Sequence, residues 1–161
     1  MGFEAGAIFV YRPQASGGYE EVKLHSSDAA ERDQFGENIT INDDGVIVVG
    51  VPAKKAVYVY TPDETGTYSE TKLGATNHLY QEFGEAVDIN SNGLIVVGVP
   101  GYTYINSQGN RVTNLGGVAV YTPDADGGYT EQFLIPPIIG DICINIRLRC
   151  GYRRIPESLR T

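Results

Sequence analysis

Apolar and polar residues follow two patterns that each occur twice in the chain. Residues 38–42 and 86–90 alternate apolar and polar side chains, which is typical of a strand with one exposed face. Residues 46–49 and 94–97 are uninterrupted apolar runs rich in β-branched side chains, which favours strands buried on both faces. An Asp-Asp-Gly or a Ser-Asn-Gly separates the members of each pair, and the glycine tolerates the positive φ of a tight hairpin. The pattern therefore predicts two antiparallel hairpins, and no segment shows helical periodicity.

A third and a fourth strand are expected after each hairpin. Pro52 and Pro100 end the second strand, because proline cannot donate to a sheet ladder. A third strand follows at 56–60 and is closed by Tyr-x-Pro, and its equivalents are residues 7–11 and 118–121. A glycine-containing loop then leads to a fourth strand, which is expected at 68–73 and at two equivalent places in the chain.

These segments form a repeat of about 48 residues. Of the 18 positions from Phe35 to Pro52, 12 recur identically 48 residues later. Four short antiparallel strands per repeat are the unit of a β-propeller blade. A β-sandwich would also have short strands and regular turns, but it does not demand near-identical repeats. The predicted fold class is all-β, an incomplete β-propeller of about two and a half to three four-stranded antiparallel blades.

The repeats divide the chain into a repeat region, residues 1–134, and a tail, residues 135–161. Within the repeat region we expect strands three and four of one blade at about 6–24, a whole blade at 35–74 and another at 83–134. The tail has a different composition, since it holds both cysteines and a group of arginines. Phe35 follows Leu24 by 11 residues and Phe83 follows Leu73 by 10, so another Phe-Gly is due soon after Leu134, but residues 135–161 contain none.

Two hypotheses explain the tail. Codons can be chosen for residues 146–153 whose next reading frame encodes another Phe-Gly opening, so the tail can be an out-of-frame product. Alternatively it is a terminal edge strand, because Ile142, Ile144, Ile146 and Leu148 alternate with more polar residues in period two.

The order of motifs resembles a known repeat. Phe-Gly, then Val-Gly-Val-Pro, then a Val-Tyr-Val-Tyr strand resemble the FG-GAP repeat of integrin α-subunit propellers, in its short-hairpin subtype, over about residues 6–134. The resemblance implies that each Phe-Gly opens the innermost strand of a blade. There the glycine permits close backbone approach, and the phenylalanine packs between blades. The repeat motif comprises Phe35, Gly36, Gly50, Pro52, Phe83, Gly84, Gly98 and Pro100.

In integrin-type repeats the first hairpin often carries a calcium loop. Asp88, Asn90 and Asn92 resemble the opening of such a loop. Calcium takes six to eight oxygen ligands, several of them carboxylates, and here the closing carboxylate is missing because the chain continues as an apolar run. We therefore expect plain hairpin turns, with no metal and no other cofactor.

The second repeat carries an insertion, residues 101–117, where the first has only residues 53–55. Long loops on a rigid scaffold often carry function. In the family that the sequence resembles, such loops share a face with the connections between blades, and ligands bind there. Tyrosine rings and amides suit a glycan or a protein loop, and the alternative is a plain surface loop. The candidate ligand-binding residues are Tyr102, Tyr104, Asn106, Gln108, Asn110, Arg111 and Asn114.

Charge and hydropathy narrow the range of partners. The chain has 20 acidic and 12 basic residues and a net charge of −8, which disfavours nucleic acid and anionic membrane surfaces. No run of 18 apolar residues is present, so we expect no membrane span. The open edges of an incomplete ring favour self-association.

The resemblance implies a non-catalytic scaffold for binding or adhesion, extracellular or at the cell surface, although the N-terminus lacks the pattern of a signal peptide. An alternative is a glycan-active propeller enzyme, which needs a cluster of carboxylates or arginines on the inner strands. Those strands present mainly Glu37, Asn38, Glu85 and Asp88. A third hypothesis is a truncated gene product without selected activity. Of these we expect the non-catalytic scaffold.

Overall fold

The computed structural model describes residues 5–106 and 108–135, and these residues form an all-β fold whose one helical element is the 3-10 turn η1 (Pro52–Lys54). The N-terminal sheet contains β1 (Ile8–Pro13) and β2 (Tyr19–Leu24). The central sheet contains β3 (Asn38–Ile41), β4 (Ile47–Val51), β5 (Ala56–Pro62) and β6 (Tyr68–Gly74). The C-terminal sheet contains β7 (Val87–Ile89), β8 (Ile95–Gly98), β11 (Val118–Pro123) and β12 (Tyr129–Leu134), and a separate small hairpin joins β9 (Tyr104–Ile105) to β10 (Arg111–Val112).

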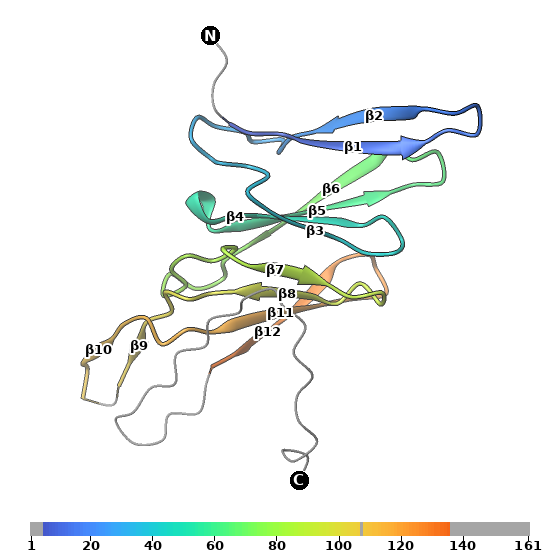
Figure 1. Cartoon of the computed structure of the whole chain (residues 1–161). Helices are drawn as coiled ribbons and strands as arrows, with labels where there is room; N and C mark the ends of the chain where they lie inside the picture. Colours follow the sequence, from blue (N-terminus) through green and yellow to red (C-terminus); the bar gives the residue numbers. More distant parts are fainter. Residues whose placement is uncertain (1–4, 107, 136–161) are drawn as a thin grey trace, which may run out of the picture.

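The three sheets are antiparallel and lie one above another (Figure 1). In the central sheet the spatial order is β3-β4-β5-β6, and the C-terminal sheet repeats it as β7-β8-β11-β12. The predicted third strands run two residues further than expected, through Pro62 and its two equivalents. Pairing of β5 with β4 ends at Tyr60, so the absent N–H of Pro62 costs no bond on that side. Apart from Ile135, the tail and the two hypotheses about it lie outside the described residues.

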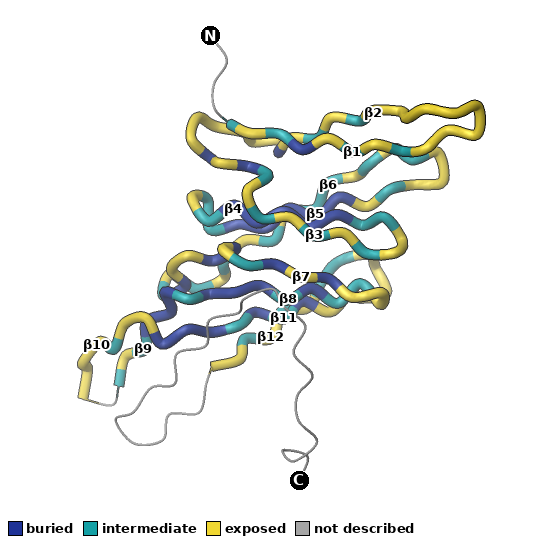
Figure 2. Tube along the Cα trace, viewed as in Figure 1, coloured by how far each residue is buried: buried dark blue, intermediate teal, exposed yellow. Residues whose placement is uncertain are grey.

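The hydrophobic core lies between the sheets in two layers. Alternate residues of a strand point to opposite faces, so Tyr58 and Tyr60 of β5 pack toward the N-terminal sheet while Val57 and Val59 pack toward the C-terminal sheet. The central sheet is therefore buried on both faces (Figure 2), as its continuous apolar runs predict. We call the layer between the N-terminal and central sheets the first interface, and the layer between the central and C-terminal sheets the second interface.

Each Phe-Gly phenylalanine is buried in one of these interfaces. Phe35 lies in the first interface, with its ring centroid 5.9 Å from Tyr58 and 6.0 Å from Tyr60 in edge-on geometry. Phe83 lies in the second interface, 6.4 Å from Tyr121 and also edge-on. Edge-on pairs add to the free energy gained by burying the rings, so these phenylalanines hold neighbouring sheets together.

The motif glycines sit where backbones approach closely. Gly36 and Gly84 have φ of 97° and 93°, which favour glycine. A Cβ on Gly50 would lie 2.0 Å from the carbonyl oxygen of Gly84, which lies just before β7, so a side chain would force the two segments apart. The edge strands of the two four-stranded sheets, β3 and β7, also meet: the Thr40 hydroxyl donates to Asp88 Oδ1 over 3.4 Å. The edge strands β3 and β7 therefore lie side by side where the two four-stranded sheets meet.

Candidate functional site

Loops of two kinds lie at opposite ends of the strands (Figure 1). One end carries the tight turns within the hairpins, and the other carries η1, the connections between sheets and the β9–β10 hairpin. Backbone hydrogen bonds join the loops at this second end: Ala75 donates to Lys55 over 3.0 Å, and Thr103 donates to Leu79 over 3.2 Å. We call this end the connection face. The insertion therefore shares a face with the connections, as the family resemblance implies.

Four of the tight turns at the opposite end are each built on one side chain. Asn90 Oδ1 accepts the backbone N–H of Asn92 over 3.0 Å and of Leu94 over 2.9 Å, while Gly93 has a φ of 77°. Such side-chain mimicry of a turn is a known role of Asn and Asp. The same pair of bonds is made in three other turns at this end by Asn42, Asp63 and Asp124. Asn106 makes it in the β9–β10 hairpin on the connection face.

The weak calcium candidates lie in one of these turns and in the strand before it. The amide oxygen of Asn90 already accepts two N–H groups of the turn. Asp88 Oδ1 accepts the N–H of Ile89 over 2.9 Å as well as the Thr40 hydroxyl. Within residues 5–106 and 108–135, no three His, Cys, Asp or Glu side chains are grouped so that they could hold a metal ion. The turn gives Asn90 a structural reason to be asparagine.

The base of the insertion is fixed in the core. Tyr102 is buried in the second interface, with its ring centroid 4.9 Å from Phe133 and 6.0 Å from Tyr80. The backbone N–H of Leu115 donates to the Tyr102 carbonyl over 3.0 Å and closes the base. These contacts hold the hairpin on the C-terminal sheet and place the Tyr102 ring inside the molecule.

Beyond this base the insertion projects into solvent. Asn106 Oδ1 accepts the N–H of Gln108 over 3.0 Å and of Asn110 over 2.8 Å, so its amide oxygen builds the turn of the hairpin. Tyr104 is half-buried on β9, while Arg111 on β10 is exposed. Of the predicted ligand-binding residues, those with exposed side chains are Gln108, Asn110, Arg111 and Asn114.

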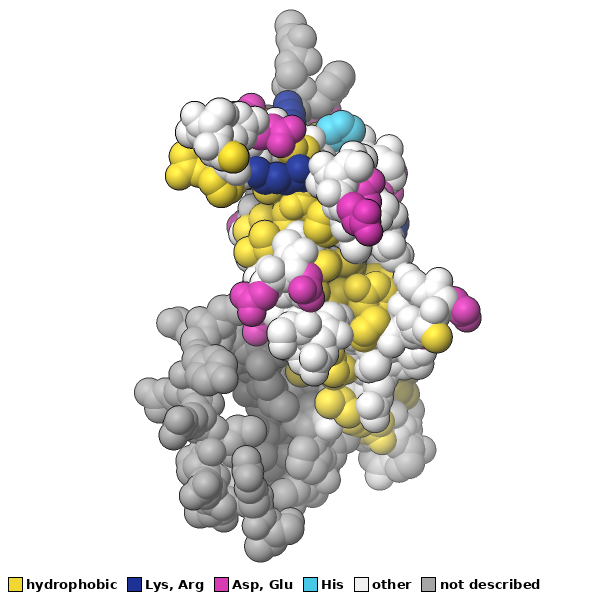
Figure 3. Space-filling view, turned by 90° about the vertical axis from the view of Figure 1, so that its right-hand side faces the viewer, with side chains coloured by type: hydrophobic (Ala, Val, Ile, Leu, Met, Phe, Trp, Pro, Cys, Tyr) yellow, Lys and Arg dark blue, Asp and Glu magenta, His cyan; other side chains and the backbone are white. Residues whose placement is uncertain are grey.

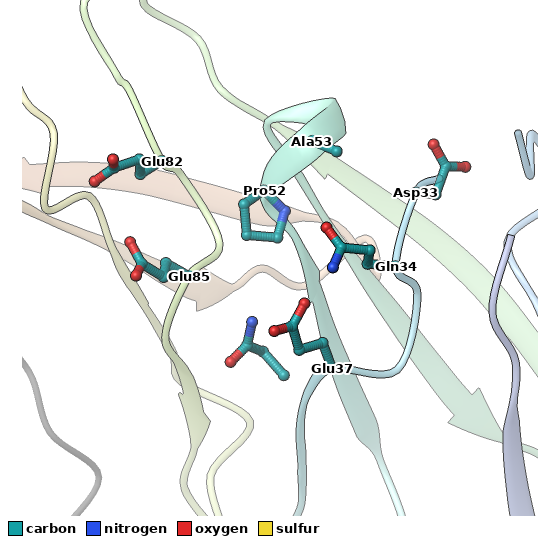
Figure 4. A pocket seen from close by; sticks show the side chains of 8 residues that line it. Asp33, Gln34, Glu37, Pro52, Ala53, Glu82 and Glu85 are labelled. Atoms are coloured by element: carbon teal, nitrogen blue, oxygen red, sulfur yellow. The ribbon is translucent and has the colours of Figure 1, made fainter. Parts of the chain in front are cut away.

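A pocket of about 260 Å³ opens on the connection face between the central and C-terminal sheets (Figure 4). Glu37 and Gln34 line one side and Glu82 and Glu85 the other, with Pro52 between them. Gln34 and Glu82 occupy equivalent places before the two Phe-Gly pairs, and both have a positive φ. Six of the lining side chains are polar, and four of these are acidic: Asp33, Glu37, Glu82 and Glu85.

Ion pairs fix the connection that precedes β3. Asp28 accepts hydrogen bonds from Lys72 Nζ over 2.5 Å, from Tyr58 Oη over 2.6 Å and from Lys54 Nζ over 3.0 Å. These hydrogen bonds hold the pKa of the Asp28 carboxyl well below its usual range. The bond from Lys72 has the largest effect on the pKa, followed by those from Tyr58 and Lys54. Burial lowers the pKa of Lys54, but hydrogen bonds to Asp33 and Asp28 outweigh it and leave that pKa raised. The connection is thereby tied to η1, β5 and β6.

Two glutamates of the fourth strands tie down the connections in the same way. Glu70 accepts the hydroxyl of Tyr60 over 2.8 Å and both the N–H and the hydroxyl of Ser27. Glu131 accepts the hydroxyl of Tyr121 over 3.0 Å, and also those of Thr76 and Tyr80 over 3.0 and 3.2 Å. Burial, followed by the nearby Glu131 charge, raises the pKa of Tyr80 to about 12.

Sequence reasoning missed the pocket and this anchoring. The anchoring glutamates do belong to a sequence pattern, because a glutamate follows two residues after the first tyrosine of each fourth strand. These glutamates are Glu21, Glu70 and Glu131. Its role required the register that places Tyr60 opposite Glu70, and the fold that brings Ser27 beside them. No sequence pattern indicates that Gln34 and Glu82 line one pocket, because they come together only when the central and C-terminal sheets pack.

Comparison with known proteins agrees with the repeat. Residues 19–60 match the family model described as the FG-GAP repeat. This segment runs from β2 through the first three strands of the central sheet and includes Phe35 and Gly36. The chain thus carries an FG-GAP repeat. No curated protein matches the chain. The described residues contain no helix long and apolar enough to cross a membrane.

Proposed function

We propose that the chain is a non-catalytic binding scaffold, extracellular or at the cell surface, in which the three sheets are blades of an incomplete β-propeller. Sequential antiparallel sheets, packed face to face through their repeat motifs, support the propeller arrangement. The FG-GAP repeat at residues 19–60 supports a role in binding or adhesion.

The observation that carries the proposal is the insertion. It is held at its base by Tyr102 and by the backbone bond from Thr103 to Leu79 in the connection before β7, yet its hairpin presents exposed polar side chains. A fixed base with an exposed tip lowers the entropy lost when a ligand binds. The connection beneath it is pinned by Glu131, so the site is preorganised.

The tip favours a protein loop or a glycan as ligand. Tyr104 offers an aromatic face, Arg111 a guanidinium group, and Gln108 and Asn110 offer amides that donate and accept hydrogen bonds. The net charge of −8 disfavours a polyanion such as nucleic acid. Neutral glycans and protein loops are the ligand classes that fit.

The test is capture of ligands from a glycan array and from a displayed peptide library by the full chain. For a captured ligand, we expect the double variant Asn110→Ala, Arg111→Ala to bind at least about tenfold more weakly, as for a central contact in an interface. The matched control is Thr122→Ala, an exposed position at the other end of β11. Captured ligands that bind the double variant as tightly as the unmodified chain would rule out the tip as the site.

The pocket favours a second candidate, an enzyme that acts on glycans. Glu37 and Glu85 line one opening, and paired carboxylates are the groups that glycoside hydrolysis uses. This candidate predicts hydrolysis of a glycan substrate that Glu85→Gln abolishes and that Gln132→Ala, an exposed position on β12, leaves unchanged. Absence of turnover on a broad glycan panel, together with ligand binding at the tip, would favour the scaffold.

A further inference from the structure

The turn between β7 and β8 contains Asn92 followed by Gly93, and no other asparagine of the chain is followed by glycine. Asn92 is exposed, and its side-chain amide makes no hydrogen bond to any residue that the structure describes. Asn90 in the same turn and Asn42 in the equivalent turn differ in this respect, because their side-chain oxygens each accept two backbone N–H groups. Asn92 therefore combines an unengaged amide with a next residue that has no side chain.

This combination suits an intramolecular reaction of the Asn92 side chain. The backbone nitrogen of Gly93 attacks Cγ of Asn92 and forms a new N–Cγ bond, and the side-chain nitrogen leaves as ammonia with the proton of the Gly93 N–H. The product is a cyclic imide, which water then opens. Cleavage of the new N–Cγ bond gives aspartate, and cleavage between the Gly93 nitrogen and the main-chain carbonyl carbon gives isoaspartate. Glycine favours the attack, because it has no Cβ to hinder the approach of the two groups.

The backbone bonds of the turn oppose the attack. The Gly93 N–H donates to the Asn90 carbonyl over 3.0 Å, and the Leu94 N–H donates to Asn90 Oδ1 over 2.9 Å. Both bonds lie at the exposed end of a hairpin, where local opening leaves the core between the sheets intact. They therefore restrain the rate of the reaction and do not prevent it.

An equivalent turn shows that aspartate fits at this place. Asp44 occupies the position of Asn92, 48 residues earlier. Its N–H donates to Asn42 Oδ1 over 3.1 Å, as that of Asn92 donates to Asn90 Oδ1 over 3.0 Å, and the glycine after each has a φ of 77°. The aspartate product therefore keeps the turn. Isoaspartate lengthens the backbone of the loop, so it displaces the N–H groups that Asn90 accepts and disturbs the register of β7 and β8.

The reaction would also change the charge at the tight-turn end of the strands. Seen from this end, acidic side chains stand at several places on the surface (Figure 3). The turn between β7 and β8 has no acidic residue, because it reads Ser91, Asn92 and Gly93. Either product adds one negative charge there. The neighbouring turns already carry exposed aspartates, namely Asp43, Asp44, Asp63, Asp124 and Asp126.

We propose that Asn92, followed by Gly93, is a site of spontaneous deamidation whose rate is restrained by the bonds of the Asn90 turn. The site lies at the opposite end of the strands from the insertion, so the proposal does not depend on the ligand that binds there.

The test is peptide mapping by mass spectrometry of the full chain after incubation in a mildly alkaline buffer, beside a synthetic peptide with the sequence of residues 87–95. We expect aspartate and isoaspartate at Asn92 in both. The chain should react more slowly than the peptide, but by no more than about tenfold, because only exposed turn bonds have to open. Asn42 and Asn90 should stay asparagine over the same time. A slower reaction at Asn92, or an equal reaction at Asn42 and Asn90, would overturn the proposal.

Variants of the turn provide the second arm. Asn90→Ala removes the acceptor of two turn bonds and should raise the rate at Asn92 to that of the peptide. Ser91→Ala, at an exposed residue of the same turn, is the matched control and should leave the rate unchanged. Gly93→Ala in the peptide should slow the reaction at least about tenfold, because the added side chain hinders the attack. A rate at Asn92 that Asn90→Ala does not raise, or that Gly93→Ala does not lower, would contradict the proposal.

Discussion

Asp28 joins three elements through one carboxylate, since Lys54 follows β4, Tyr58 lies on β5 and Lys72 on β6. These bonds hold the pKa of Asp28 below its usual value of about 4 in an unfolded chain. A carboxyl group whose pKa is lower in the folded state stabilises that state at pH values above the unfolded pKa. This stabilisation is lost as the pH falls through the folded pKa.

We therefore predict that Asp28→Asn destabilises the chain at pH 7 and destabilises it less, though still measurably, near pH 2. Urea unfolding across this range measures the difference in unfolding free energy, which should shrink as the pH falls below about 4. Asp43→Asn, at an exposed turn residue, is the control and should follow the unmodified chain throughout. A constant difference across the whole range would show that Asp28 acts by packing and not by charge.

In the tight hairpins, one side-chain acceptor and one glycine specify a three-residue loop between two strands. Asn90 satisfies two backbone N–H groups of its turn, and Gly93 adopts a positive φ that other residues rarely accept. The same device recurs in turns that share little other sequence, such as those of Asp63 and Asn106. A repeated turn fixes strand register, because it sets which residues face each other across the hairpin.

Asn90→Ala removes the acceptor of both turn bonds and should lower the free energy of unfolding by about 1–2 kcal/mol, at about 1 kcal/mol per hydrogen bond. Asn92→Ala is the control in the same turn, where the side chain is exposed, and should have a small effect. Thermal unfolding with and without calcium measures both variants. Because the Asn90 oxygen is already engaged, we expect calcium to leave the loss unchanged; a loss seen only with calcium would instead make Asn90 a metal ligand.

At the scale of the whole molecule, stability depends on the contacts between sheets. Each sheet packs on its neighbour through equivalent residues, so the chain behaves as a short stack in which most contacts are with the adjacent repeat. Phe83 is fully buried in the second interface, against Tyr80 and Tyr121. It belongs to the core cluster that the central and C-terminal sheets share.

Phe83→Ala should therefore lower the free energy of unfolding by about 3–5 kcal/mol, the range for removing a large aromatic side chain from a core. Phe9→Ala, at an exposed aromatic residue, should change it by no more than about 0.5 kcal/mol. Chemical unfolding of the two variants gives the comparison. Similar losses for both would mean that Phe9 is covered in solution and would contradict the exposed face on the N-terminal sheet.

Local signals in the sequence determined the elements of this protein. Alternation at 38–42 and the apolar run at 46–49 predict β3 and β4, and prolines and glycines predict where strands end, because these features act through the backbone of a few neighbouring residues. The repeat determined that sheets recur and that Phe35 and Phe83 have the same role. The strand boundaries differ by one or two residues, chiefly where Pro62 and its equivalents extend the third strands.

Tertiary structure alone decided which equivalent residues are buried and which groups meet. Tyr102 reads as a loop residue in the sequence, yet it lies in the core because the insertion folds back onto Tyr80 and Phe133. Phe9 is exposed and Tyr58 is buried at matching positions, since burial depends on whether a neighbouring sheet lies against the residue and not on the residue itself. The pocket and the anchoring glutamates arise from packing between segments far apart in the chain, which local pattern cannot encode.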